Sequence, residues 1–290
     1  MCKFMSVPQS KPSWLKIRLP AGDAHREVSN LIRRQGLHTV CQSARCPNLG
    51  ECWSAGTATF MILGDVCTRH CTFCAVPGGL PLPPDPGEPL RLAHSVKELG
   101  LAYAVITSVT RDDLPDGGAE QFAATIAAIR EISPGCKIEV LIPDFGGNPE
   151  AQKLVFDAIP DVLNHNLETV SSLYPRVRPE ADYRRSLDLL KYANKCGLKT
   201  KTGLMLGLGE EEGEVEHVLE DLIQIQCRLL TLGQYLRPSP NHHPVVRYVP
   251  PDEFAAWAKR GKEMGFEHVE AGPLVRSSYH AERQAMKSAV

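Results

Sequence analysis

Residues 57–74 read TATFMILGDVCTRHCTFC, an apolar run that leads into three closely spaced cysteines. The run Thr57–Leu63 contains β-branched and aromatic residues, so we predict a buried strand there. Cys67, Cys71 and Cys74 then lie in a loop at the carboxyl end of that strand. In barrels of parallel strands, this end carries the loops that form active sites. The stretch therefore predicts a barrel-like fold and the position of its site.

The rest of the chain alternates short apolar runs with amphipathic helical patterns. Five further strands are expected, at Ala102–Val109, Lys137–Ile142, Val162–Asn166, Lys199–Met205 and Leu229–Leu236. Alternation of this kind favours right-handed βαβ units on a parallel sheet. Six such units are fewer than the eight that close a TIM barrel. We therefore predict an α/β fold, a partial (β/α)6 TIM-like barrel with N- and C-terminal extensions.

The segments outside this alternation define the expected domain boundaries. The stretch Pro77–Pro89 contains six prolines and three glycines, so it is expected to be a loop. A helix is expected over Ala24–Arg34, before the repeating units. We divide the chain into an N-terminal extension (1–55), a partial barrel (56–238) and a C-terminal extension (239–290).

The overall charge and the N-terminal residues restrict the class of protein. A formal net charge of -2 with scattered charged residues argues against a nucleic-acid partner. No apolar run approaches the roughly 18 residues that span a bilayer, and residues 1–20 lack the apolar region of a signal peptide. We therefore expect a cytoplasmic protein without membrane partners, and a monomer by default. In a reducing compartment, clustered cysteines indicate metal or redox chemistry rather than disulfides.

Six of the ten cysteines form two triads. Cys41, Cys46 and Cys52 have the spacing C-x4-C-x5-C, and the triad that follows the first strand has the spacing C-x3-C-x2-C. Each triad is one ligand short of a closed structural metal site, which indicates an open coordination position. Three thiolates can hold three irons of a [4Fe-4S] cluster and leave the fourth iron open. The alternative is a zinc site in which His70 supplies the fourth ligand. The other four cysteines are isolated and are expected to be ordinary thiols.

The second triad resembles the signature of the radical S-adenosylmethionine (SAM) superfamily. That signature is C-x3-C-x2-C after the first strand of a partial barrel, with an aromatic residue, here Phe73, before the last cysteine. The resemblance implies that Cys67, Cys71 and Cys74 hold a [4Fe-4S] cluster whose open iron binds SAM. It also implies that an electron from this cluster cleaves SAM to give a 5′-deoxyadenosyl radical.

The first triad and the C-terminal sequence Arg276-Ser-Ser-Tyr279 together resemble the lipoyl synthase family. The resemblance implies an auxiliary [4Fe-4S] cluster. The implied ligands of that cluster are Cys41, Cys46, Cys52 and Ser278. A hard alkoxide oxygen is a poorer ligand for iron than a thiolate, so the serine forms the weak corner of such a cluster. The similarity extends from about residue 25 to residue 282, and the residues before about 20 show no sign of it.

This resemblance also implies a reaction and its partners. The reaction is that of a sulfurtransferase, which inserts sulfur at C6 and C8 of a protein-bound octanoyl chain to give the lipoyl cofactor. The auxiliary cluster is the implied sulfur donor. The implied substrates are octanoylated lipoyl carrier domains, of a 2-oxoacid dehydrogenase E2 subunit or a glycine cleavage H protein. An electron donor such as flavodoxin or ferredoxin is also implied.

Several polar residues lie near the carboxyl ends of the predicted strands, where a barrel gathers its ligands, and Lys201 lies on the predicted strand Lys199–Met205. Asn166 and Glu168 are candidates for hydrogen bonds to the ribose hydroxyls of SAM. Thr107 is a candidate for the amino group of SAM, and Lys201 for its carboxylate. Each of the four has an alternative role as an interior polar residue satisfied by its neighbours. Phe73 is assigned to the same cofactor site.

The acidic residues Asp112, Asp113 and Asp116 lie close together, but two intervening residues interrupt the alternation of a metal-binding loop. We expect these carboxylates to cap helix ends or to form ion pairs. Arg276 is expected to balance the charge of the auxiliary cluster or to screen the cluster from substrate.

Two other functions stay open on the sequence alone. One is a different radical SAM enzyme with an auxiliary cluster, against which the first triad and Ser278 argue. The other is a non-catalytic scaffold stabilised by zinc, which colour distinguishes because iron–sulfur proteins are brown.

Overall fold

The sheet that forms the body of the molecule has eight strands in the order of the chain, β1 to β8. The computed structural model describes residues 11–16, 23–44, 46–54 and 59–286. The strands are β1 (His38–Thr39), β2 (Thr59–Ile62), β3 (Tyr103–Ser108), β4 (Lys137–Leu141), β5 (Val162–Asn164), β6 (Thr200–Leu206), β7 (Leu229–Gln234) and β8 (His268–Gly272). β1 pairs antiparallel with β2, and every later pair is parallel.

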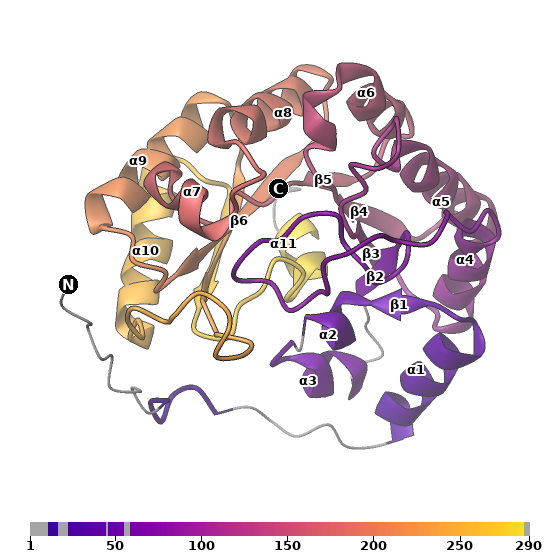
Figure 1. The fold of residues 1–290 in the computed structure, drawn as a ribbon, viewed down its shortest axis with the longest axis horizontal. Coiled ribbons are helices and arrows are strands. Elements are labelled where there is room, and N and C mark those ends of the chain that lie inside the picture. The colour runs from indigo at the N-terminus through magenta and orange to yellow at the C-terminus, as the bar shows by residue number, and fades with distance from the viewer. Residues whose placement is uncertain (1–10, 17–22, 45, 55–58, 287–290) are drawn as a thin grey trace.

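The six predicted strands correspond to β2–β7, and the predicted partial barrel is confirmed. β1 and β8 are not paired with each other, so the sheet curves without closing (Figure 1). The predicted first strand began at Thr57, which lies outside the described residues. The two outer strands were not predicted, because β1 has only two residues and β8 has a single fully buried side chain, Val269. β8 lies in the predicted C-terminal extension, yet it joins the main sheet.

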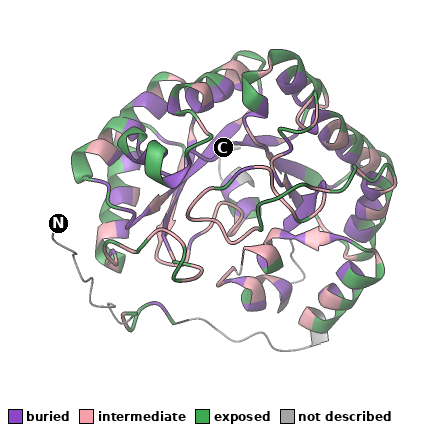
Figure 2. Ribbon diagram, in the orientation of Figure 1, coloured by how far each residue is buried: buried purple, intermediate pink, exposed green. Residues whose placement is uncertain are grey.

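Helices cover the outer face of the sheet, and Figure 2 shows their buried sides turned toward it. The main ones are α4 (Glu88–Glu98), α5 (Ala119–Ile132), α6 (Pro149–Asp157), α8 (Tyr183–Lys195), α9 (Glu212–Gln224) and α10 (Pro251–Met264). Local residues set their ends: the Asp182 carboxylate accepts from the backbone of Arg185 at the start of α8, and Gly265 adopts a left-handed conformation at the end of α10. No helix in the described ranges is long and apolar enough to span a membrane.

The remaining helical elements lie at the two ends of the chain and in the connecting loops. They are α1 (Asp23–Arg34), α2 (Val40–Ser43), α3 (Leu49–Ser54), α7 (Tyr174–Val177), α11 (Ala281–Met286) and the 3-10 turns Phe145–Gly147 and Ser171–Leu173. α1 confirms the helix predicted at Ala24–Arg34. The proline-rich stretch forms neither helix nor strand up to residue 87, as predicted, and α4 begins at its end.

The C-terminal tail lies within the curve of the sheet rather than outside it (Figure 1). Ala281 of α11 packs against Tyr103 and Val105 of β3 in a small buried cluster. The tail also passes close to β7 at Gly233. A Cβ atom at this glycine would lie 2.2 Å from the carbonyl oxygen of Val275. The absence of a side chain at Gly233 therefore lets the tail approach the sheet.

Replacing Gly233 by alanine should separate the tail from β7. Because the clash is with backbone, the tail has to move, and we expect Gly233→Ala to lower the free energy of unfolding by about 1–3 kcal/mol. Gly213→Ala is the matched control, since nothing lies within 4 Å of a Cβ in this helical position. Denaturant unfolding of both variants is the measurement, and equal stability of the two variants contradicts the prediction.

Candidate functional site

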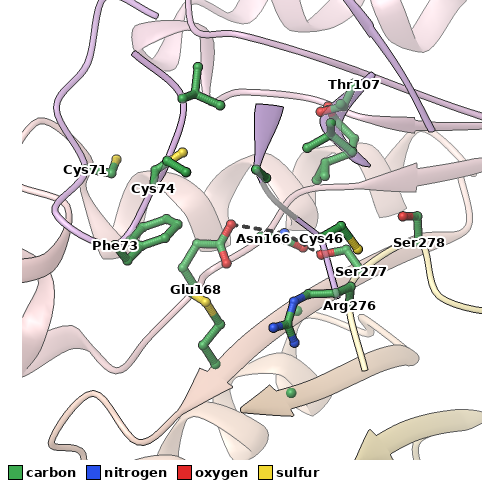
Figure 3. A pocket seen from close by; sticks show the side chains of 18 of the residues that line it. Cys46, Cys71, Phe73, Cys74, Thr107, Asn166, Glu168, Arg276, Ser277 and Ser278 are labelled. Carbon is green, nitrogen blue, oxygen red and sulfur yellow. Dashed lines mark hydrogen bonds between the residues drawn. The ribbon is translucent and has the colours of Figure 1, made fainter. Parts of the chain in front are cut away.

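A cavity of about 510 Å3 lies inside the sheet, at the carboxyl ends of the parallel strands. It is lined by residues of both cysteine triads and of the C-terminal tail, far apart in the sequence. Those from the triads and the tail are Cys41, Cys46, Cys67, Cys71, Phe73, Cys74, Val275, Arg276, Ser277 and Ser278. Figure 3 shows Cys71 and Cys74 on one side of the cavity, Cys46 and Ser278 on the other, and Glu168 and Asn166 between them.

The second triad folds as a loop fixed by its own backbone. The Cys67 amide donates to the Pro77 carbonyl at 2.8 Å, and the Cys74 amide donates to the Cys71 carbonyl at 3.1 Å. Two backbone N–H groups, of Arg69 and Thr110, point at the Cys67 sulfur at 3.4 and 3.3 Å. All three cysteines line the cavity.

Burial changes the acidity of the thiols in this triad. It raises the pKa of Cys71 to about 12 and the pKa of Cys74 to about 11, against the opposing charge of Arg178 at Cys71 and a backbone hydrogen bond from Val76 at Cys74. Free thiols of this kind keep their protons at neutral pH. Binding of iron therefore has to displace protons, and the metal supplies the compensating positive charge.

The zinc alternative is not supported by the surroundings of His70. Its Nδ1 lies 3.2 Å from Glu180 Oε1, its side chain is 67% exposed, and the residue does not line the cavity. Across the part of the chain that is described, no three His, Cys, Asp or Glu side chains gather closely enough for one metal ion. A single zinc ion needs such a group, whereas a cluster spreads its thiolates over several irons.

The first triad lies on the short helices at the N-terminal end. Cys41 is in α2, Cys52 is in α3, and Cys46 lies between them, with its amide bonded to the Cys41 carbonyl at 3.0 Å. Burial raises the pKa of all three thiols, to about 12 for Cys52, and the Arg276 guanidinium acts in the opposite direction at Cys46. Cys41 and Cys46 line the cavity, and Cys52 does not.

Hydrogen bonds join the C-terminal tail to this N-terminal region. The Asn48 amide donates to the Leu274 carbonyl at 2.7 Å, and the Tyr279 hydroxyl donates to Glu51 at 3.1 Å. Between these two bonds, the Ser278 hydroxyl accepts from the Thr59 hydroxyl at 2.9 Å. The structure thus brings Ser278 to the same side of the cavity as the first triad.

The candidate SAM-binding residues lie between the two triads. The Asn166 amide donates to Glu168 Oε1 at 3.0 Å and to Ser277 Oγ at 2.6 Å, as Figure 3 shows. Asn166 Oδ1 is buried and has no partner among the described residues. Burial raises the pKa of Glu168, whose backbone adopts a positive φ of 64°. A buried acceptor without a partner and a strained backbone both indicate a ligand-binding site.

Two other predicted cofactor residues differ in their placement. Thr107 lines the cavity, although its hydroxyl already donates to the Leu141 carbonyl at 2.9 Å. Lys201 lies outside the cavity lining, fully buried, and donates to both oxygens of Glu139 at 3.0 and 3.3 Å. The structure therefore favours the alternative role of Lys201, that of an interior residue satisfied by its neighbours.

The acidic residues after β3 have the structural roles predicted for them. Asp112 pairs with Arg69 at 2.7 Å, and Asp113 pairs with Arg111 at 2.8 Å. Asp116 accepts from the backbone of Glu120 at 2.8 Å, near the start of α5. Because these carboxylates are used in pairs and caps, they do not form a metal loop.

Three residues of the site were not assigned from the sequence. Arg178 is buried and donates to the carbonyls of Asn166 and Leu167, each at 2.9 Å. Ser277 and Thr59 are the other two. Arg178 follows the predicted strand Val162–Asn166 and could have been singled out as a basic residue, whereas Thr59 looks like any other threonine of a strand.

Comparison with known proteins gives the class first. A sequence model described as the radical SAM superfamily matches residues 61–222. Among solved structures, the chain resembles HydG, a maturase of the [FeFe]-hydrogenase, with a TM-score of 0.56 and 14% identity over 84% of this chain and 62% of that one. It also resembles Streptococcus suis SuiB bound to S-adenosylmethionine, with a TM-score of 0.54 and 15% identity over 82% of this chain and 56% of that one. At these identities, the two structures support the fold alone.

The relatives in sequence are more specific. A model described as the N-terminal domain of lipoyl synthase of the radical SAM family matches residues 7–46. The lipoyl synthase of Rubrobacter xylanophilus is 58% identical over 94% of this chain and 86% of its own length. That of Methylococcus capsulatus is 57% identical over 96% of this chain and 88% of its own length. The chain belongs to the lipoyl synthase family. The expectation that residues before about 20 carry no family similarity was wrong, because the match begins at residue 7.

A buried histidine beside the site, His165, makes the stability of the folded protein depend on pH. His165 Nδ1 lies 2.8 Å from the Ile142 carbonyl and Nε2 lies 3.0 Å from the Ser186 hydroxyl. Burial lowers the pKa of His165 to about 4, and the charge of Arg178 acts in the same direction. The imidazole is therefore neutral at physiological pH, with its proton on Nδ1, because the carbonyl can only accept.

This depressed pKa predicts a loss of stability in acid. An unfolded histidine binds a proton near pH 6.5, so the His165 contribution is complete above that pH and disappears as the pH falls toward 4. The expected loss is about 3 kcal/mol in the free energy of unfolding. Denaturant unfolding from pH 7.5 to 4.5, in the parent and in His165→Asn, measures it. Equal pH slopes in the two proteins would contradict the prediction.

Proposed function

We propose that the chain inserts two sulfur atoms, at C6 and C8, into a protein-bound octanoyl chain, as the sulfurtransferase that makes the lipoyl cofactor. The observation that carries this proposal is one cavity that is lined by cysteines of both triads together with Ser278. Simple SAM cleavage needs one cluster site. A second site on the opposite wall of the same cavity suits a reaction in which a substrate radical meets a sulfur donor.

The residues present fit the cofactors of this family, SAM and two [4Fe-4S] clusters. We assign Cys67, Cys71 and Cys74 to the SAM-binding cluster. The assigned ligands of the auxiliary cluster are Cys41, Cys46, Cys52 and Ser278. When bound, the SAM-binding cluster supplies the electron that cleaves SAM to a carbon radical, and the auxiliary cluster supplies sulfur. Buried thiols with raised pKa values and one hydroxyl form a donor set that suits iron.

The protein's own polar residues orient SAM between the clusters. Asn166 Oδ1, a buried acceptor without a partner in the described chain, suits a ribose hydroxyl, and the neighbouring Glu168 carboxylate suits the second one. Phe73 and Thr107 line the same region, where they restrict the position of the adenosine and methionine parts. Arg178 holds the backbone of Asn166 in place through its carbonyl.

Apolar side chains line the space that remains. Met61, Val109, Leu141, Met205 and Val275 all face the cavity. An octanoyl chain has no polar group along its methylenes, so an apolar wall binds it and excludes water that would otherwise compete for reactive species. The carrier domain stays outside, because the cavity holds a lysine-linked chain but not a folded domain.

The partners follow from this reaction. We propose octanoylated carrier domains of a 2-oxoacid dehydrogenase E2 subunit or a glycine cleavage H protein, and flavodoxin or ferredoxin as the electron donor. A cytoplasmic location agrees with the need to keep cluster thiols reduced. The small net charge of -2 agrees with the lack of a nucleic-acid partner, and we propose a monomer without membrane partners.

Iron counting tests the two-cluster assignment. After anaerobic reconstitution, we expect about eight irons per chain, and about four in either the Cys67/Cys71/Cys74→Ala or the Cys41/Cys46/Cys52→Ala variant. The first variant should lose SAM cleavage. The second variant should retain it and form no lipoyl product from an octanoylated carrier.

Three outcomes of that experiment distinguish the rival functions. About four irons in the parent, all lost with the second triad, indicate a radical SAM enzyme without this sulfur donor. Zinc in place of iron indicates the scaffold. Full lipoyl product without the first triad would show that sulfur comes from elsewhere.

Asn166 tests the position of SAM. Removing a hydrogen-bond partner of the ribose should weaken SAM binding by about tenfold in Asn166→Ala. Asn194→Ala is a control, because the Asn194 amide bonds Thr200 and the Ile225 carbonyl away from the cavity. Equilibrium binding of SAM to the reconstituted proteins gives the dissociation constants. If both variants bind as the parent does, the ribose lies elsewhere.

A further inference from the structure

Thr59 lies at a position that the reaction outlined above does not use. It is the first residue of β2, it is buried, and its hydroxyl lies 2.9 Å from the Ser278 hydroxyl. A backbone hydrogen bond from Thr59 also lowers the pKa of the Cys41 thiol, against the effect of burial. Thr59 is therefore in contact with two of the groups assigned to the auxiliary cluster.

The other hydrogen bonds between the tail and the N-terminal region do not involve the Ser278 hydroxyl. Asn48 bonds the Leu274 carbonyl, and Glu51 bonds the Tyr279 hydroxyl. Among the described residues, Thr59 is the one hydrogen-bond partner of the Ser278 hydroxyl. The direction in which Ser278 presents its oxygen thus depends on Thr59.

The chemistry of a serine ligand sets the direction of this hydrogen bond. When Ser278 binds iron, its hydroxyl proton passes to water as the O–Fe bond forms, and it returns when the bond breaks. A bound alkoxide has no hydrogen and can only accept. Thr59 is then the donor, as it is in the structure. A hydrogen bond to a charged oxygen is stronger than one to a neutral hydroxyl.

We propose that Thr59 is a positioning residue that keeps Ser278 bound to the auxiliary cluster. Its donated hydrogen bond stabilises the bound alkoxide more than the free hydroxyl, so it shifts the equilibrium toward the ligated form. It also fixes the serine rotamer that faces the cluster. The bond between Ser278 and iron, the weakest of the cluster's protein bonds, is thereby kept until the reaction breaks it. This inference rests on the proposed function, because it requires Ser278 as a ligand.

Iron release from the auxiliary cluster tests the proposal without any turnover. The Cys67/Cys71/Cys74→Ala background leaves this cluster alone, and a ferrous chelator then reports iron loss by absorbance. We expect Thr59→Val to release iron about fivefold faster, the factor expected for one charge-assisted hydrogen bond over a neutral one. Thr59→Ser, which retains the hydroxyl, should stay close to the background rate.

Two controls separate positioning from a general loss of structure. Thr125→Val removes another buried hydroxyl, which bonds the Gln121 carbonyl in α5, and should leave iron release unchanged. Valine keeps the β-branched shape in the strand, and unfolding of the cluster-free proteins reports any change in stability.

A double variant tests whether Thr59 acts through the serine. In Thr59→Val with Ser278→Ala, the rate of iron release should equal that of Ser278→Ala alone.

The outcomes separate this inference from the function on which it rests. If Ser278→Ala itself leaves iron release unchanged, the serine is not a ligand and the assignment of the auxiliary site fails. If Ser278→Ala accelerates release but Thr59→Val does not, the serine assignment stands and the role of Thr59 is overturned. Additive effects in the double variant also overturn it, because they indicate independent actions.

Discussion

The tail segment from Leu274 to Tyr279 lies inside the curve of the sheet, and both halves of the site depend on this placement. Gly233 makes room for it at β7, while Asn48 and Glu51 bond it from the N-terminal side. These bonds join residues 226 and 228 positions apart along the chain. Closing such long loops costs entropy that only the packed fold offsets. A closed barrel would leave no room for the tail, so the open sheet is a requirement of the site.

The two consecutive serines of the tail serve different walls of the cavity. Ser277 accepts a hydrogen bond from Asn166, beside the region assigned to SAM, and Ser278 accepts one from Thr59, beside the first triad. Residues 277–280 form a turn, in which the Tyr279 amide donates to the Arg276 carbonyl at 2.9 Å, and this turn presents the two hydroxyls to different partners. The tail therefore lies between the two regions and contacts both. A displacement of its backbone moves both contacts at once, which couples the geometry of the SAM region to that of the auxiliary site.

The sequence predicted what local pattern determines. The six inner strands are apolar runs, and the cysteine spacings are visible without a structure, so the sheet and the triads could be read directly. Thr59 could not, because its role comes from a partner 219 positions away. β8 was not predicted for a related reason. Its sequence pattern is half polar, and only pairing with β7 makes it a strand. Lys201 was placed on the correct strand, but the strand period alone did not reveal that Glu139 was its partner.

The ion pair between Lys201 and Glu139 restricts which residues can bind SAM. Glu139 accepts from Tyr103, Asn164 and Lys201, so its two oxygens are fully used by three neighbouring strands. Leu141, Asn166 and Gly203, each two residues further along from Glu139, Asn164 and Lys201, line the cavity, and side chains two apart point the same way. The charged network is therefore the layer beneath the cavity floor. Drawing Lys201 upward to a ligand would leave a buried carboxylate unpaired, at a cost of about 3–5 kcal/mol. Residues in the layer above this network therefore have to contact the charged groups of SAM.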